Sequence, residues 1–135
     1  MAGGLIRRFP AAGLEPVLKL LFFRGHDTAS QAEEAMRVRW PTYASRFGPG
    51  AFIRLVGLLY VHDTLAVAHQ LPSLRVPARV AWGTGDPFQK IEYGERFARD
   101  LSAPLHRIEG GKHFTPKDHS EMVAQAIQEL IAEAA

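Results

Sequence analysis

The spacing of apolar residues changes near residue 71 and divides the chain into two parts. Before this point, apolar side chains recur every three or four positions, which is the pattern of amphipathic helices. After it, short apolar runs alternate with helical patterns, which indicates that strands and helices alternate along the chain. We therefore expect an α/β protein with a helical segment over residues 1–70 and a strand-helix-strand-helix unit over residues 71–135.

The ends of the expected helices in the first part are marked by glycine, proline and capping residues. Gly25 ends the first helix, and either Asp27 or Thr28 can cap the second. Gln31 would complete a capping box for that helix, and Pro41 would end it. After an irregular lead-in over 1–13, the expected helical ranges are 14–23, 28–40 and 51–61, with a further turn or two over 63–70.

The second part is expected to begin with a strand after Pro77, a position at which the missing N–H does least harm. The expected elements are a strand over 78–82, a helix over 91–101, a strand over 105–108 and a last helix. Asp118 and Glu121 would form the capping box of the last helix, which carries a broad apolar stripe. A helix between two strands implies a crossover connection, so the strands should be parallel.

Each expected strand runs into a glycine-rich turn that presents one ionisable side chain. The first turn, residues 83–86, ends in Asp86, and the second, residues 110–113, ends in His113. Because parallel strands end at the same edge of a sheet, we expect Asp86 and His113 to meet although they are far apart in the sequence.

These residues resemble the C-terminal portion of an α/β-hydrolase-fold protein. The matching motifs are Val76-Pro77, Trp82-Gly83 with Asp86, and Gly110-Gly111 with His113-Phe114. Residues 14–70 resemble the helical cap that the family inserts before its acid strand. The resemblance implies that Asp86 is the acid and His113 the base of a nucleophile-acid-histidine triad, with Phe88 and Phe114 beside the substrate pocket. It implies no cofactor and no metal.

The chain lacks the third member of such a triad. The family's nucleophile sits on a strand-turn-helix elbow, typically Gly-x-Ser-x-Gly, and none of the five serines has that context. Lys112 and Ser120 also replace a common glycine and proline of the pattern. We expect the C-terminal part of an enzyme that hydrolyses a small, apolar, ester-like substrate and is inactive alone. The missing nucleophile can be Ser, Asp or Cys, so esterase, epoxide hydrolase, dehalogenase and C–C hydrolase remain open.

An incomplete sheet has a physical consequence. The strand over 78–82 would lose a neighbour and become an exposed edge, which recruits partners. We expect self-association or binding of a complementary N-terminal chain. The second reading is accordingly a non-catalytic remnant or interaction module that binds a partner through the cap or this edge. An all-helical regulatory domain is a third reading, and the strand after Pro77 argues against it.

Simpler roles for the same residues also stand. Asp86 before a proline can be a turn former, and His113 can be a surface histidine. The pairs His113 with His119 and His62 with His69 suggest metal ligands, but each lacks a third ligand.

Composition excludes several classes of function. There is no cysteine, so disulfides, thiol catalysis and Cys-based zinc sites are excluded. Sixteen basic and fourteen acidic residues give a formal charge of +2, and no run of Lys or Arg exceeds two residues, so we expect no nucleic-acid partner. No apolar run approaches the roughly 20 residues of a membrane helix, and no secretory leader is visible. We expect a cytoplasmic protein that does not enter a membrane.

Overall fold

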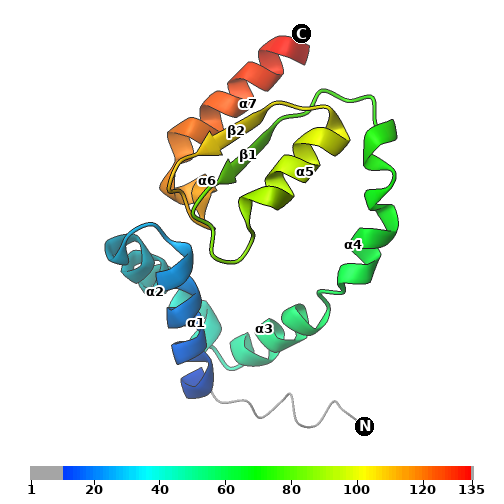
Figure 1. The fold of residues 1–135 in the computed structure, drawn as a ribbon. Helices are drawn as coiled ribbons and strands as arrows, with labels where there is room; N and C mark the ends of the chain where they lie inside the picture. Colours follow the sequence, from blue (N-terminus) through cyan, green and yellow to red (C-terminus); the bar gives the residue numbers. More distant parts are fainter. Residues whose placement is uncertain (1–10, 135) are drawn as a thin grey trace.

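The protein is of mixed α/β class, and its described residues form seven helices and a two-stranded parallel sheet (Figure 1). The computed structural model describes residues 11–134. The elements in chain order are α1 (Ala11–Gly25), α2 (Ala29–Ala44), α3 (Gly48–Gly57), α4 (Val61–Ala68), a 3-10 turn (Leu71–Ser73), β1 (Val80–Gly83), α5 (Ile91–Leu101), β2 (Leu105–Ile108), α6 (Thr115–Asp118) and α7 (Ser120–Ala134).

Most expected elements are present, with differences at their ends. The ranges of α5 and β2 agree with the prediction. The irregular lead-in falls mostly outside the described residues, and the prediction is wrong for residues 11–13, which belong to α1. The predicted end of α2 at Pro41 is also wrong, because the helix continues to Ala44. Trp40 and Tyr43 lie on either side of this proline and pack against the helical core, so burial of the two rings holds the helix together.

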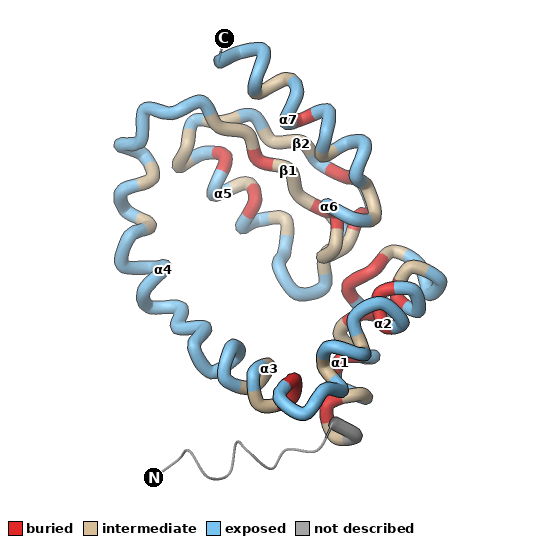
Figure 2. The backbone as a smooth tube through the Cα atoms, turned by 180° about the vertical axis from the view of Figure 1, so that it is seen from behind, coloured by how far each residue is buried: buried red, intermediate tan, exposed pale blue. Residues whose placement is uncertain are grey.

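The α1 and α2 helices form a core of their own. Leu14, Leu18 and Phe22 recur every four residues on α1 and are nearly fully buried. They pack against Ala32, Ala35 and Met36 of α2, where two small side chains let the helices approach closely. Figure 2 shows this buried cluster at the contact of the two helices.

The sheet is small, and its two strands are in parallel register. Val80 pairs with Leu105 and Gly83 with Ile108, so both strands end at the same edge. Between them α5 makes the crossover and lies against β1. Gly94 permits this packing, because a Cβ atom there would lie 2.8 Å from the Trp82 ring. The helix α7 is held to the strands by Arg79, which pairs with Glu129 at 2.7 Å.

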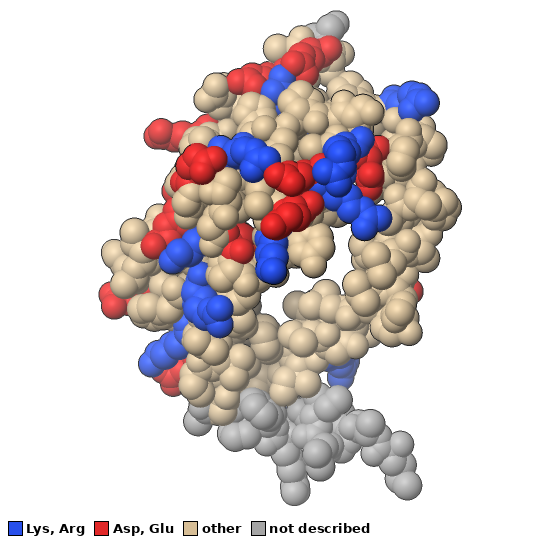
Figure 3. All heavy atoms as spheres, in the orientation of Figure 1, with Lys and Arg blue, Asp and Glu red and all other residues tan. Residues whose placement is uncertain are grey.

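The helices α3 and α4 form an arm, residues 48–68, that carries many exposed apolar side chains. Leu55, Leu58 and Leu59 are 61%, 72% and 74% exposed, and α4 contains no buried residue. Figure 3 shows few charged side chains on the visible face of this arm, and a hollow separates part of the arm from the other elements. Within residues 11–134, no single helix is long and apolar enough to cross a membrane; α3 and the segment Val61–Ser73 reach that length only as a pair bent by 40°.

Candidate acid–base site

The two glycine-rich turns are tied to each other directly beyond the strand ends. The N–H of Thr84 donates to the carbonyl of Ile108 at 3.0 Å, which extends the ladder by one residue. The N–H of Gly110 donates to Oγ1 of Thr84 at 2.8 Å, and the N–H of Gly85 donates to the carbonyl of Gly111 at 3.0 Å. These bonds fix the two turns relative to each other and therefore fix the side chains that the turns present.

The close approach of the turns requires glycine at two positions. A Cβ atom on Gly83 would lie 2.1 Å from the carbonyl oxygen of Gly111, which no side chain can occupy. Gly110 has φ of 71°, in the left-handed region that glycine adopts without steric cost. The glycines thus bring the backbone before His113 against the end of β1.

Asp86 and His113 meet at this edge, as the sequence predicts. Oδ2 of Asp86 lies 2.9 Å from Nδ1 of His113, although 27 positions separate the two residues. The side chain of Asp86 is 7% exposed and that of His113 is 34% exposed. With Nδ1–H donated to the carboxylate, the lone pair of the neutral ring is on Nε2. Within residues 11–134, this Nε2 has no hydrogen-bond partner.

The other oxygen of Asp86 organises its own turn. Oδ1 accepts hydrogen bonds from the N–H groups of Phe88, at 2.7 Å, and Gln89, at 3.0 Å. Asp86 is therefore a turn former as well as the partner of His113. Three hydrogen bonds to one carboxylate hold it in a single orientation.

The two phenylalanines predicted beside a pocket both contact His113, but they differ in their other contacts. The Phe88 ring meets the His113 ring edge to face at 5.2 Å and is 37% exposed. The Phe114 ring also meets His113, at 5.4 Å, but it packs on the helical core through Phe22 at 5.6 Å. Phe88 is thus the ring available to a ligand, whereas Phe114 joins the site to the helices.

A second His–Asp pair lies behind the site and was missed in the sequence. His26 follows α1, and its Nδ1 lies 2.8 and 2.9 Å from the two oxygens of Asp118. Both side chains are almost completely buried, at 2% and 1% exposure. The predicted capping box of Asp118 with Glu121 is wrong, because the carboxylate of Asp118 is turned toward His26 and also accepts the N–H of Asp27 at 3.1 Å.

Asp27 has a similar long-range role. The helix α2 is capped by Thr28, whose capping box with Gln31 is confirmed, so the alternative cap Asp27 is not used. Oδ1 of Asp27 accepts the N–H of Lys112 at 2.8 Å, and Oδ2 pairs with Nε2 of His119. These contacts join residues that are 85 and 92 positions apart in the sequence. No local pattern around Asp27 indicates them.

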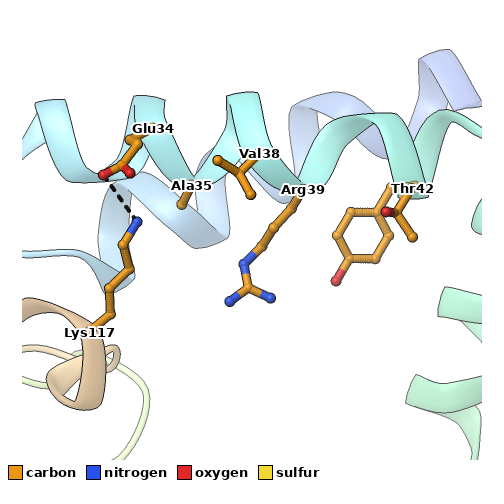
Figure 4. Close-up of a pocket in the computed structure, with 7 residues that line it drawn as sticks. Glu34, Ala35, Val38, Arg39, Thr42 and Lys117 are labelled. Carbon is orange, nitrogen blue, oxygen red and sulfur yellow. Dashed lines mark hydrogen bonds and ion pairs between the residues drawn. The ribbon is translucent and has the colours of Figure 1, made fainter.

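A separate depression among the described residues lies on the helical segment. Its volume is about 560 Å³, and it contains none of the four predicted site residues. Figure 4 shows it along α2, with Lys117 reaching Glu34 at 3.3 Å. The lining consists of Glu34, Ala35, Val38, Arg39, Thr42, Tyr43 and Lys117. This depression is therefore separate from Asp86 and His113.

In the two histidine pairs considered as metal ligands, the histidines contact other residues. His113 pairs with Asp86, whereas His119 pairs with Asp27. His62 packs against the ring of Tyr60 at 5.0 Å. No cluster of three or more potential ligand side chains occurs within residues 11–134.

Comparisons with protein-family models, with curated proteins and with solved structures gave no match.

Proposed function

We propose that Asp86 and His113 are the acid and base of a hydrolase of the α/β-hydrolase type. The observation that carries this proposal is the 2.9 Å contact between Asp86 Oδ2 and His113 Nδ1 at the common edge of two parallel strands. The contact leaves Nε2 of His113 as the free acceptor, which is the atom that a general base uses.

The residues of this chain would act in a simple order. Nε2 of His113 takes the proton of a hydroxyl nucleophile or of an attacking water. Asp86 keeps the ring in the correct tautomer and stabilises the imidazolium that forms. Its two further hydrogen bonds, from Phe88 and Gln89, keep the carboxylate aimed at the ring. The exposed ring of Phe88 favours a small apolar substrate, of which an ester is the proposed class.

The nucleophile is proposed to come from another segment. None of the five serines has the Gly-x-Ser-x-Gly context, and no serine hydroxyl within residues 11–134 bonds to His113. The helical segment would then be a cap, and residues 71–135 the end of a larger hydrolase core. A nucleophile elbow would enter with additional parallel strands beside β1.

Two observations test this function. The purified chain is expected to give no turnover of p-nitrophenyl butyrate, because His113 has no nucleophile to activate. Turnover that disappears in His113→Ala would place a nucleophile inside the chain and overturn that part of the proposal. In the coding sequence upstream of Met1, an in-frame Gly-x-Ser-x-Gly after an apolar run would support the enzyme, and an immediate stop codon would favour a non-catalytic protein.

A second candidate function is partner binding through the free edge of β1. In the described residues β1 pairs only with β2, and the bonded N–H groups include those of Val80 and Thr84. Because bonding alternates along a parallel strand, the N–H groups of Ala81 and Gly83 point to the opposite edge. An edge with such unpaired groups is a template for another strand.

Ala81→Pro is expected to weaken self-association without opening the sheet. Proline removes only the outward N–H at this position, and edge strands tolerate proline in that orientation. The measurement is sedimentation velocity of the wild type, Ala81→Pro and the control Ala81→Val, which keeps the N–H. We expect assemblies in the wild type and the control, and mostly monomer in Ala81→Pro. A wild-type chain that is monomeric and melts cooperatively contradicts a functional edge.

A further inference from the structure

The backbone on both sides of His113 is anchored to the connection between α1 and α2. The N–H of Lys112 donates to Oδ1 of Asp27 at 2.8 Å. The N–H of Phe114 donates to the carbonyl of Gly25 at 3.1 Å. The two residues that flank His113 are therefore hydrogen-bonded to two residues near the end of α1, although Lys112 and Asp27 are 85 positions apart. Movement of this connection would move His113.

The connection is itself held by a buried pair. Asp118 accepts from Nδ1 of His26 and from the N–H of Asp27, at 2.8 and 3.1 Å. The side chains of His26 and Asp118 are 2% and 1% exposed, so these bonds are made away from water. Breaking one of them would leave a buried polar group without a partner, which is more costly than losing a surface bond.

Ring contacts continue the same path. The His26 ring is stacked on the Phe114 ring at 4.3 Å with an angle of 23°. Phe114 meets the His113 ring edge to face. Gly25 leaves room for this arrangement, because a Cβ atom there would lie 2.6 Å from Cε2 of Phe114. Hydrogen bonds and aromatic contacts thus form a continuous path from His26 to His113.

We propose that Asp27 and Asp118 are positioning residues for His113. Through them, the position of His113 depends on how the helices α1 and α2 pack against the strand-helix unit. Asp86 fixes the ring of His113 through Nδ1, whereas the connection at residues 25–27 fixes the backbone that carries the ring. The inference rests on the proposed function, in which His113 is the base.

Asp27→Ala tests the proposal, because it removes the acceptor of the Lys112 N–H. The readout is the rate at which diethyl pyrocarbonate modifies His113, mapped by mass spectrometry on the full chain. His106 is the internal reference, because its side chain is 28% exposed, close to the 34% of His113, and it lies on β2. We expect the His113-to-His106 rate ratio to rise at least about three- to tenfold, the change in population that loss of the Lys112 hydrogen bond alone produces. The substitution also removes the contact of Oδ2 with His119.

Two further variants separate positioning from general stability. Asp27→Asn keeps Oδ1 as an acceptor and is expected to restore a ratio close to the wild-type value. Glu34→Gln removes the exposed Lys117–Glu34 pair between α2 and α6 and is expected to leave the ratio unchanged. An unchanged ratio in Asp27→Ala, or equal increases at His113 and His106, overturns the proposal. The labelling needs no turnover, so failure of the proposed hydrolase function would be seen separately, as absent hydrolysis in a protein that also contains the missing nucleophile.

Discussion

Replacing His113 by Ala is expected to lower kcat by about 10⁴-fold or more in a protein that contains the missing nucleophile. Such a protein, the complemented protein, is made by joining the N-terminal portion of an α/β hydrolase, with its Gly-x-Ser-x-Gly elbow and ending before its cap, to this chain. The loss follows because Nε2 of His113 is the proposed acceptor of the nucleophile's proton. The assay is hydrolysis of p-nitrophenyl butyrate.

Asp86→Asn in the complemented protein is expected to lower kcat by about 10³- to 10⁴-fold. The amide nitrogen can donate to Nδ1 of His113, which would place the proton on Nε2 and remove the base. The matched control is Asp100→Asn, because Asp100 lies on α5 and, among residues 11–134, its side chain pairs only with Arg96. A control that loses as much activity as Asp86→Asn, or a fully active His113→Ala, would contradict the assigned roles.

Among glycine-to-alanine substitutions at the site, Gly83→Ala is expected to lower the free energy of unfolding the most. Its Cβ atom would lie 2.1 Å from the carbonyl oxygen of Gly111 and 2.8 Å from that of Lys112. Both obstacles are backbone atoms, and the bond from Thr84 to Ile108 holds the strands at this spacing. Overpacking of this kind costs about 3 kcal/mol or more, which corresponds to a fall in Tm of roughly 10 °C.

The control for this substitution is Gly57→Ala. A Cβ atom on Gly57, the last residue of α3, meets nothing within 4 Å. Its Tm, followed by tryptophan fluorescence, is expected to stay within a few degrees of the wild type, since alanine is favourable in a helix. Equal Tm values for Gly83→Ala and Gly57→Ala would show that the two turns are not packed together as described.

Local signals account for the elements that the sequence predicts well. The amphipathic pattern of α5 lies within the helix, and Pro104 and Gly110 bound β2 closely, so the predicted ranges of both elements agree with the structure. The predicted meeting of Asp86 and His113 depends on one more step, the parallel crossover, and it is confirmed. The start of β1 moves from residue 78 to Val80, where the first bond to Pro104 forms.

Long-range contacts explain what the sequence does not predict. Asp118 and His26 are 92 positions apart, and the local pattern of Asp118 with Glu121 is typical of a helix cap. A buried histidine is a stronger partner than an exposed helix end, so the carboxylate turns inward. The continuation of α2 past Pro41 has the same cause, because Trp40 and Tyr43 pack against residues of α1 and α3. Packing between distant segments decides both cases.

The most direct measurement of the central claim is the rate of p-nitrophenyl butyrate hydrolysis by the chain alone and by the complemented protein. The account predicts no turnover by the chain alone and clear turnover after complementation. That turnover should require both the elbow serine and His113. Two results would contradict the assignment of Asp86 and His113 as the acid and base of a divided hydrolase site. One is turnover by the chain alone that depends on His113. The other is a folded complemented protein whose activity is unchanged by His113→Ala.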